Sequence, residues 1–325
     1  MLEQRRAPAP GFAADVPAGG YHWWYFDAMS DDGSRALTVI VFVGSVFSPY
    51  YAAARRRHGS SAVDPQQHCG FNAVLYGPGG SKRWAMTERG AGDLRRDAGT
   101  LAARGSAVHW ATGRVVIELD EVTVPLPRRL CGRIEFELPA TTATEYGLDP
   151  GGRHHWWPVA PSCAVRVAMT APALQWSGHG YFDSNRGSEP LEAGFRDWDW
   201  SRAPLADGSA LLQYHARLRG SGDERALTLR VDAAGAAMEP APLQPRQLPP
   251  TAVWRIARET RADADTVPRV RRTLEDTPFY ARSLVDMEAL GEPVTAVHES
   301  LDLDRFRRRW VQTLLPFRLP RRARR

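Results

Sequence analysis

The chain has 325 residues and a formal net charge of +5, with 43% hydrophobic and 10% aromatic residues. These values are typical of a folded protein with one large or two ordinary domains, and they exclude a disordered chain or a disulfide-stapled miniprotein. The longest apolar run, residues 36–47, is interrupted by Thr38, Gly44 and Ser45 and falls short of the roughly 20 residues of a transmembrane helix. Residues 1–20 contain no apolar signal-peptide core, so we expect a cytoplasmic protein.

The cysteines are three in number and widely spaced. Cys69, Cys131 and Cys163 form no C-x-x-C pair, which argues against a cysteine-ligated zinc site and fits a reducing compartment. We expect all three to be inert packing residues.

Alternating apolar and polar residues dominate the chain and predict strands. In chain order these are residues 36–43, 70–76, 114–119, 133–138, 164–169, 210–218, 226–231 and 251–258, then a hairpin of 279–290 and 294–303 around Gly291, Glu292 and Pro293. The 28 glycines and 25 prolines separate these runs at short intervals, and no long amphipathic pattern precedes residue 305. The fold class predicted is mainly β.

A short internal repeat suggests two parts. Tyr-Phe-Asp occurs at residues 25–27 and again at 181–183, each time after a Gly/aromatic stretch and before a turn-like segment. The separation is about half of the chain. We therefore predict two consecutive β-barrel or sandwich domains, residues 1–170 and 171–325, with a pocket at their interface.

Two clusters of polar and aromatic residues flank the predicted junction. They are residues 153–158 (RHHWWP) and 175–187 (QWSGHGYFDSNRG). Alternate side chains of a strand share a face, so His179, Tyr181 and Asp183 can point together. The same rule pairs His154 with Trp156, and His155 with Trp157.

This combination suits acid catalysis on an apolar substrate. A carboxyl surrounded by aromatic rings loses hydration of its charged form, which raises its pKa and keeps it protonated, and ring faces stabilise a cation. Protonation of an alkene needs both. Two alternatives remain open at this point: Asp183 as a turn residue in the turn-like sequence DSNRG, and the two adjacent histidines as a hydrogen-bonded rim.

Other chemistries have weaker support. Adjacent histidines on a strand face opposite ways, and H-E-x-x-H, G-x-S-x-G and phosphate-loop patterns are missing from the sequence. We expect no metal and no cofactor.

The C-terminal segment is strongly basic. Residues 305–325 contain nine arginines and no carboxylate, which leaves the rest of the chain at −4. Phe306, Trp310, Val311 and Leu314 follow a helical spacing that ends at Pro316. An amphipathic helix bordered by arginines suits an anionic membrane surface, or else its apolar face packs on the body of the protein. Nucleic acid is not expected as a partner, because no nucleic-acid-binding motif accompanies the basic residues.

Several motifs give the chain a family resemblance. It resembles the carotenoid 1,2-hydratases, also called hydroxyneurosporene synthases, over nearly its whole length. The matching segments are residues 20–28 (GYHWWYFDA), 30–33 (SDDG), 48–51 (SPYY), 68–76 (HCGFNAVLY), 155–158 (HWWP), 178–187 (GHGYFDSNRG), 195–201 (FRDWDWS), 278–283 (PFYARS) and 298–304 (HESLDLD). The resemblance implies two tandem lipocalin-like β-domains with a short C-terminal amphipathic helix.

The resemblance also implies an activity. It is the cofactor-independent addition of water to the terminal C1=C2 bond of an acyclic carotene such as neurosporene or lycopene. The implied essential residues are His154, Trp156, Tyr181 and Asp183. Asp183 would protonate C2, Trp156 and Tyr181 would stabilise the cation at C1, and His154 would orient Asp183 or accept a proton from water.

Further substrate contacts are expected from residues around these four. They are Trp23, Trp24, His155, Trp157, His179 and Trp198, with core packing as the alternative for Trp23 and Trp24. We also expect Asp197 or Asp199 to pair with Arg186 or Arg196.

Two other functions compete with the hydratase: a non-catalytic carrier of an isoprenoid or other lipid, and a cyclase or pericyclase on the same fold. A carotene stays in the bilayer, so we expect the protein to associate peripherally with the inner or intracytoplasmic membrane through its basic tail.

Overall fold

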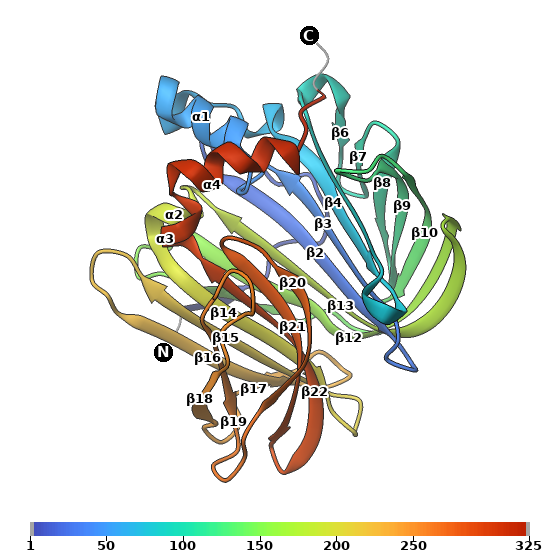
Figure 1. Cartoon of the computed structure of the whole chain (residues 1–325), viewed down its shortest axis with the longest axis vertical. Coiled ribbons are helices and arrows are strands. Elements are labelled where there is room, and N and C mark those ends of the chain that lie inside the picture. Colours follow the sequence, from blue (N-terminus) through green and yellow to red (C-terminus); the bar gives the residue numbers. More distant parts are fainter. Residues whose placement is uncertain (1–2, 323–325) are drawn as a thin grey trace.

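The structure is a computed structural model and describes residues 3–322. Within this range thirteen strands form the first sheet: β1 (Glu3–Arg6), β2 (Tyr21–Ser30), β3 (Ala36–Val43), β4 (Cys69–Tyr76), β5 (Lys82–Arg89), β6 (Leu94–Arg96), β7 (Thr100–Ala103), β8 (Ser106–Ala111), β9 (Arg114–Val122), β10 (Arg129–Glu137), β11 (Thr144–Gly147), β12 (His154–Ala171) and β13 (Ala173–Gly187). Their order is β5-β4-β3-β2-β13-β12-β10-β9-β8-β7-β6, and β11 joins β12 and carries β1. The sheet curls until β5 lies against β9, so it forms a nearly closed barrel (Figure 1).

The second sheet comes from the C-terminal half. It contains β14 (Phe195–Pro204), β15 (Ala210–Leu218), β16 (Glu224–Val231), β17 (Ala237–Met238), β20 (Arg269–Asp276), β21 (Tyr280–Ala289) and β22 (Glu292–Asp302), in the order β17-β16-β15-β14-β22-β21-β20. A separate pair is formed by β18 (Gln244–Leu248) and β19 (Arg258–Ala262). All of these pairings are antiparallel.

Helices are short in the described part of the chain. They are α1 (Pro49–His58), α2 (Leu191–Gly194), α3 (Leu303–Phe306) and α4 (Arg309–Leu314), and a 3₁₀ turn follows at Leu315–Phe317. None of the helices in residues 3–322 has the length and hydropathy to span a bilayer. Helices α1 and α4 lie at one end of the molecule, over the ends of β2, β3 and β4 (Figure 1).

Three clusters of buried apolar side chains stabilise this arrangement. One fills the interior of the nearly closed barrel that the first sheet forms, and it includes Trp24, Phe26 and Phe182. A second lies on the outer face of the second sheet, against the β18–β19 pair. The third joins the two sheets and includes Trp156, Tyr181 and Trp200. The functional residues described below belong to this third cluster.

The mainly β fold is confirmed. Seven predicted strands correspond to β3, β4, β9, β10, β12, β15 and β16, of which only 133–138 extends past the observed strand, by one residue, and the predicted hairpin is β21–β22. The strand predicted at residues 251–258 is wrong, since the segment is a turn that enters β19 only at Arg258. The Thr251 hydroxyl accepts from the Ile256 backbone N–H, and Arg255 has a positive φ of 54°, so the backbone folds back on itself.

Helix α1 was not predicted, although two common features of helix N-termini are present at its start. The Ser48 hydroxyl caps the Tyr51 N–H at 3.0 Å, and Pro49 occupies the first turn. The expected burial of the cysteines is confirmed, because all three are buried free thiols.

The boundary predicted at residue 170 falls at the turn between β12 and β13. These strands pair over most of their length, and both belong to the first sheet. The first sheet therefore extends to Gly187, and the division into two domains stays a prediction.

Candidate active site

Asp183 lies on β13 at the interface of the two sheets. Its side chain faces the third cluster because it shares the strand face of Tyr181, and the residue is only 4% exposed. Carboxylate Oδ2 accepts hydrogen bonds from the Tyr181 hydroxyl at 2.7 Å and from Trp156 Nε1 at 3.0 Å. The other oxygen, Oδ1, is buried and has no hydrogen-bond partner among residues 3–322. The carboxyl group is thus held through one oxygen only.

The environment of Asp183 favours its protonated form. Burial raises the pKa of this carboxyl to about 7, even though the hydrogen bonds from Trp156 and Tyr181 act in the opposite direction. The residue can therefore be a neutral acid near neutral pH, with two donors ready to stabilise the carboxylate that proton transfer leaves behind.

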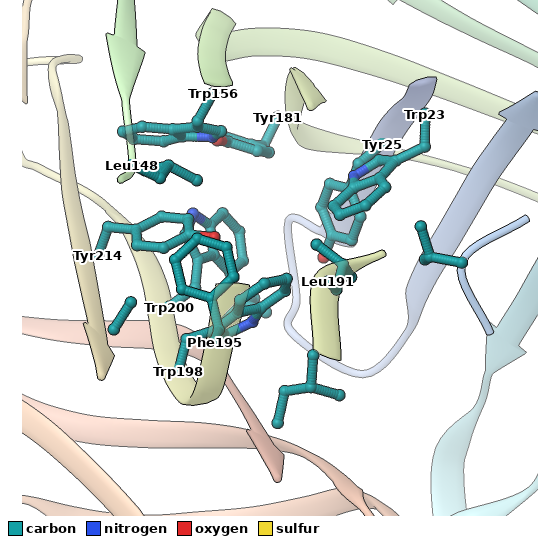
Figure 2. Packing of buried hydrophobic residues seen from close by; sticks show 14 of the residues in the cluster. Trp23, Tyr25, Leu148, Trp156, Tyr181, Leu191, Phe195, Trp198, Trp200 and Tyr214 are labelled. Carbon is teal, nitrogen blue, oxygen red and sulfur yellow. The ribbon is translucent and has the colours of Figure 1, made fainter. Parts of the chain in front are cut away.

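Aromatic rings from both sheets gather around Trp156 and Tyr181, the two side chains that donate to Asp183 (Figure 2). The Trp156 ring lies 5.4 Å from that of Tyr214, and the Tyr181 ring lies 5.0 Å from that of Trp200. Tyr25 closes one side, 6.0 Å from Tyr181. Such rings exclude water and present π faces that attract a cation.

His154 shares the strand face of Trp156 but does not contact Asp183 through a hydrogen bond. Its Nδ1 lies 2.9 Å from the Tyr21 hydroxyl and its Nε2 lies 3.2 Å from Glu189 Oε1. The ring is fully buried, and desolvation lowers its pKa in spite of Asp149 and Glu189 nearby. Both ring nitrogens are therefore engaged, as expected for a residue that positions its neighbours.

His155 lies on the strand face opposite to that of His154 and Trp156, as the alternation of side chains along a strand predicts. Its Nε2 lies 2.9 Å from the Gly152 carbonyl oxygen, and its Nδ1 is 3.6 Å from Glu145. Trp157 and Trp24 belong to the cluster inside the first sheet, where Trp157 Nε1 donates to Thr142. The structure does not bring these three expected substrate contacts to the interface, because they occupy the alternate positions of their strands.

The remaining predicted contacts are on the interface side. Trp23 and Trp198 both belong to the third cluster, and their rings lie 6.4 Å apart. His179 precedes Tyr181 by two positions on β13, so it shares the strand face of Tyr181 and Asp183, and it is partly buried. Burial, with Arg202 nearby, lowers the pKa of His179 to about 4.

A cavity of about 470 Å³ lies beside the enclosure of Asp183. Trp23, Tyr25 and Trp198 border both, whereas Asp183 itself does not line the cavity. Most of the lining is apolar, from β2 to β5 on one side and from β20 to β22 on the other. The ring wall of Trp23, Tyr25 and Trp198 therefore separates the acid from a space suited to an apolar chain.

The C-terminal segment forms part of the cavity wall. Val311, Leu314, Leu315, Phe317 and Leu319 line it, and Arg318 stacks over Trp84. Val311 and Leu319 are almost fully buried, so the expected alternative in which the tail packs on the body is confirmed for this face. The predicted single helix is interrupted between α3 and α4. The last three residues of the basic tail, 323–325, lie outside the described residues.

A buried ion cluster beside the site was not foreseen. Asp27 binds both Arg202 and Arg282, and Arg282 also binds Glu299. Burial alone would raise the pKa of Asp27, but the two arginines outweigh it and hold that pKa below its ordinary value. The repeated Tyr-Phe-Asp triplet was the available signal for Asp27, whereas the arginines come from strands distant in sequence.

The predicted partners of Asp197 and Asp199 are wrong. Asp197 pairs with Arg217, while Asp199 accepts from Ser300 and from the Glu259 N–H. Arg186 binds Glu145 on β11 and Arg196 binds Asp304 on α3, so each arginine pairs with a carboxylate from another element that is distant in sequence. No group of three or more potential metal ligands occurs within residues 3–322.

The protein is a β protein with a buried carboxyl that can be protonated near neutral pH, aromatic rings around it and an apolar cavity beside it. These features define the class of acid catalysts that act on apolar substrates. Comparison with known proteins agrees. Residues 39–325 match the family model described as carotenoid hydratase CrtC, and the chain belongs to this family.

Two relatives are similar over almost the whole chain. An acyclic carotenoid 1,2-hydratase of Thiocapsa roseopersicina is 50% identical over 315 residues, which cover 97% of this chain and 76% of the relative. An enzyme with the same description from Rubrivivax gelatinosus is 47% identical over 317 residues, covering 97% and 77%.

Solved structures show the same fold at low sequence identity. A putative AttH from Nitrosomonas europaea matches with a TM-score of 0.57 and 16% identity, covering 91% of this chain and 99% of that one. CghA bound to Sch210972 matches with a TM-score of 0.54 and 13% identity, covering 93% and 98%. These likenesses confirm the lipocalin-like β architecture and concern the fold alone.

Proposed function

We propose that this protein adds water to the terminal C1=C2 bond of an acyclic carotene, such as neurosporene or lycopene, and that Asp183 is the general acid. The observation that supports the acid is the Asp183 carboxyl itself, which is buried, has a raised pKa, and keeps Oδ1 without a partner among the described residues. The family to which the chain belongs supports the reaction and its substrate.

The reaction begins with proton transfer from Asp183 to C2. Protonation there leaves the positive charge on C1, which is the more substituted carbon and gives a tertiary cation. The rings of Trp156 and Tyr181 stabilise this cation by about 0.5 to 2 kcal/mol each, while their N–H and O–H groups stabilise the new carboxylate. Addition of water at C1 then gives a tertiary alcohol.

The cavity accepts the carotene chain in this proposal, and the terminal isoprene unit passes the rings of Trp23 and Trp198 to reach Asp183. His154 acts as a positioning residue. Its bonds to Tyr21 and Glu189 fix the start of β12, and with it the Trp156 indole that donates to the acid.

The experiment that tests this function compares wild type with Asp183→Asn, using lycopene and product mass. The wild type is expected to add the mass of one water, and the variant is expected to bind lycopene without forming the 1-hydroxy product. A wild type that binds lycopene unchanged would instead indicate a carrier. A product of unchanged mass but altered structure would indicate a cyclase, and turnover by the variant would reject Asp183 as the acid.

We also propose that the C-terminal segment contacts an anionic membrane, where an apolar substrate resides. Trp310, Leu314 and Phe317 are 43%, 45% and 74% exposed, although Leu314 and Phe317 also line the cavity. Arg307, Arg308 and Arg309 are exposed beside them. Exposed apolar rings bordered by arginines fit the headgroup region of an anionic bilayer, and they lie next to the cavity into which the carotene must pass.

Charge reversal tests this contact without removing the cavity wall. The variant Arg307→Glu, Arg308→Glu, Arg309→Glu is expected to stop floating with phosphatidylglycerol vesicles, whereas wild type floats with these and much less with phosphatidylcholine. The control reverses Arg114, Arg133 and Arg166, three exposed arginines on β9, β10 and β12. Equal flotation of both variants and wild type would overturn the proposed contact.

A further inference from the structure

One side of the largely apolar cavity is polar. Where β2, β3 and β4 face β20, β21 and β22, the lining contains eight polar side chains: Tyr25, Thr38, Asn72, Tyr76, Glu275, Asp276, Tyr280 and Glu299. Most of these groups have partners within the protein, and a carotene has no polar group to offer to the others. The second substrate of a hydration is water, and buried polar groups without protein partners are the usual sites of bound water.

Glu299 is the carboxylate best placed in this polar region. Its Oε1 lies 2.9 Å from the Tyr25 hydroxyl and binds Arg282 Nη1. The Glu299 side chain is 14% exposed, whereas the Arg282 side chain is fully buried. The carboxylate therefore borders open space, while its counter-ion lies behind it.

The charges around Glu299 balance. Asp27 and Glu299 supply two carboxylates, and Arg202 and Arg282 supply two guanidinium groups. Burial raises the pKa of Glu299 and Arg282 opposes this. A carboxyl group with a raised pKa is more basic than one in water, and the adjacent Arg282 favours its ionised form, which is the form that accepts a proton.

Two further polar atoms of the cavity lining are suited to bind water. Thr38 Oγ1 and Asn72 Oδ1 are both buried, and neither has a hydrogen-bond partner within the described part of the chain. Thr38 is 3% exposed, and both residues line the cavity from adjacent strands β3 and β4. A water in this region would find the two to four polar partners that ordered water needs.

Other groups near the acid are less suited to accept a proton. His154 has both ring nitrogens engaged, by Tyr21 and Glu189. Trp200 Nε1 and the Tyr214 hydroxyl lack partners among residues 3–322, but an indole N–H only donates, and burial raises the pKa of Tyr214 well above its ordinary value.

We propose that Glu299 is the proton acceptor for the water that attacks C1, and that Thr38, Asn72 and Glu299 form the water site. This inference rests on the proposed hydratase function. Asp183 gives its proton to C2, the water oxygen forms a bond to C1, and the proton released from that water passes to Glu299. The cycle closes when Glu299 loses this proton to solvent and Asp183 regains one.

Tyr25 links the two carboxyl groups. It is the cross-strand partner of Asp183 on β2, and its hydroxyl reaches Glu299 on β22. Acid and base therefore flank one tyrosine ring that borders the cavity, so they can approach a double bond from different sides.

Glu299→Gln in deuterium oxide separates the two proton transfers. Water addition is expected to fall on the order of 100-fold or more, while recovered lycopene still gains deuterium, because Asp183 continues to protonate C2 and the cation can return a proton to it. Full hydration by this variant would overturn the proposal, and so would loss of deuterium uptake together with hydration. Failure of wild type to hydrate lycopene would instead reject the proposed function.

The control is Glu121→Gln. Glu121 accepts two hydrogen bonds from the buried Arg89 inside the first sheet, so this variant likewise removes a negative charge from beside a buried arginine, but does so away from the site. It is expected to hydrate lycopene at the wild-type rate per folded molecule. If Glu299→Gln does not fold, Glu299→Asp keeps the charge opposite Arg282 and withdraws the carboxylate. The same loss of hydration with retained deuterium uptake is then expected, and unchanged hydration would overturn the proposal.

Discussion

Asp27 and Asp183 end two copies of the same Tyr-Phe-Asp triplet, and the two triplets pair side by side on the antiparallel strands β2 and β13. Phe26 and Phe182 stack at the centre, 4.3 Å apart. In each copy the tyrosine hydroxyl reaches the carboxyl two residues later. Yet two arginines hold the pKa of Asp27 below its ordinary value, whereas burial raises the pKa of Asp183 to about 7.

The first prediction concerns the pH dependence of hydration. Because Asp183 must be protonated and burial raises its pKa to about 7, activity is expected to be highest below pH 7. Above pH 7 it should fall about tenfold per pH unit. Initial rates of 1-hydroxy product formation between pH 5 and pH 9 measure this. A rate that rises through pH 7 would contradict a neutral carboxyl as the acid.

The second prediction concerns Tyr181→Phe. The Tyr181 hydroxyl donates to Asp183 and lowers its pKa, so removing it is expected to move the alkaline limb of the pH–rate profile to higher pH. The maximal rate should fall at the same time, on the order of 10-fold, because the carboxylate formed on proton transfer loses a donor. A profile that shifts to lower pH would show that the hydroxyl does not stabilise the carboxylate.

The third prediction concerns stability and Asp27. Asp27→Asn leaves Arg202 and Arg282 fully buried with one carboxylate between them. Loss of one partner from a buried ion cluster is expected to reduce the free energy of unfolding by about 3–5 kcal/mol. Denaturant unfolding at pH 7 measures the difference, and exposed Asp31→Asn serves as a control. A variant as stable as wild type would show that the cluster does not need the Asp27 charge.

The fourth prediction concerns Asp199, which the hydration mechanism does not use. Burial raises its pKa from 3.8 to about 7, against the hydrogen bonds from Ser300 and the Glu259 N–H. The folded form therefore favours the neutral carboxyl, and this residue's contribution to stability is lost as pH rises from about 4 to about 7. Asp199→Asn removes the titration but can keep an acceptor oxygen for both bonds.

The free energy of unfolding of wild type, relative to that of Asp199→Asn, should fall between about pH 4 and about pH 7. Above pH 7 the difference should stay constant. The loss is on the order of 1 kcal/mol per pH unit. Unfolding free energies of both proteins at pH 4, 5.5, 7 and 8 provide the test. Curves that stay parallel over this range would contradict a buried, protonated Asp199.

Much of the site follows from strand periodicity alone. Side chains two residues apart share a face, so the sequence places Tyr181 with Asp183 and His154 with Trp156, and the structure keeps both pairs together. Alternation cannot say which face meets the second sheet. Trp24, His155 and Trp157 were therefore expected at the substrate, whereas Trp24 and Trp157 pack inside the first sheet and His155 turns to Gly152 and Glu145.

The repeated triplet shows the same limit. Sequence spacing suggested equivalent positions in two tandem parts, but the two copies are neighbouring strands of one sheet. The spacing of two residues along a chain is a local property, whereas strand pairing is decided by the burial and hydrogen bonding of the complete sheet.

The sequence by itself thus determined a mainly β fold, the shared face of the acid and its tyrosine donor, and the family, because residue order and period are properties of the chain. Only the tertiary structure showed why two identical triplets hold carboxyl groups with opposite pKa shifts. Arg202 and Arg282 reach Asp27 from β14 and β21, while Asp183 receives only neutral donors, Tyr181 and Trp156. The pKa of a buried carboxyl depends on the charges around it in space, and those come from strands far apart in sequence.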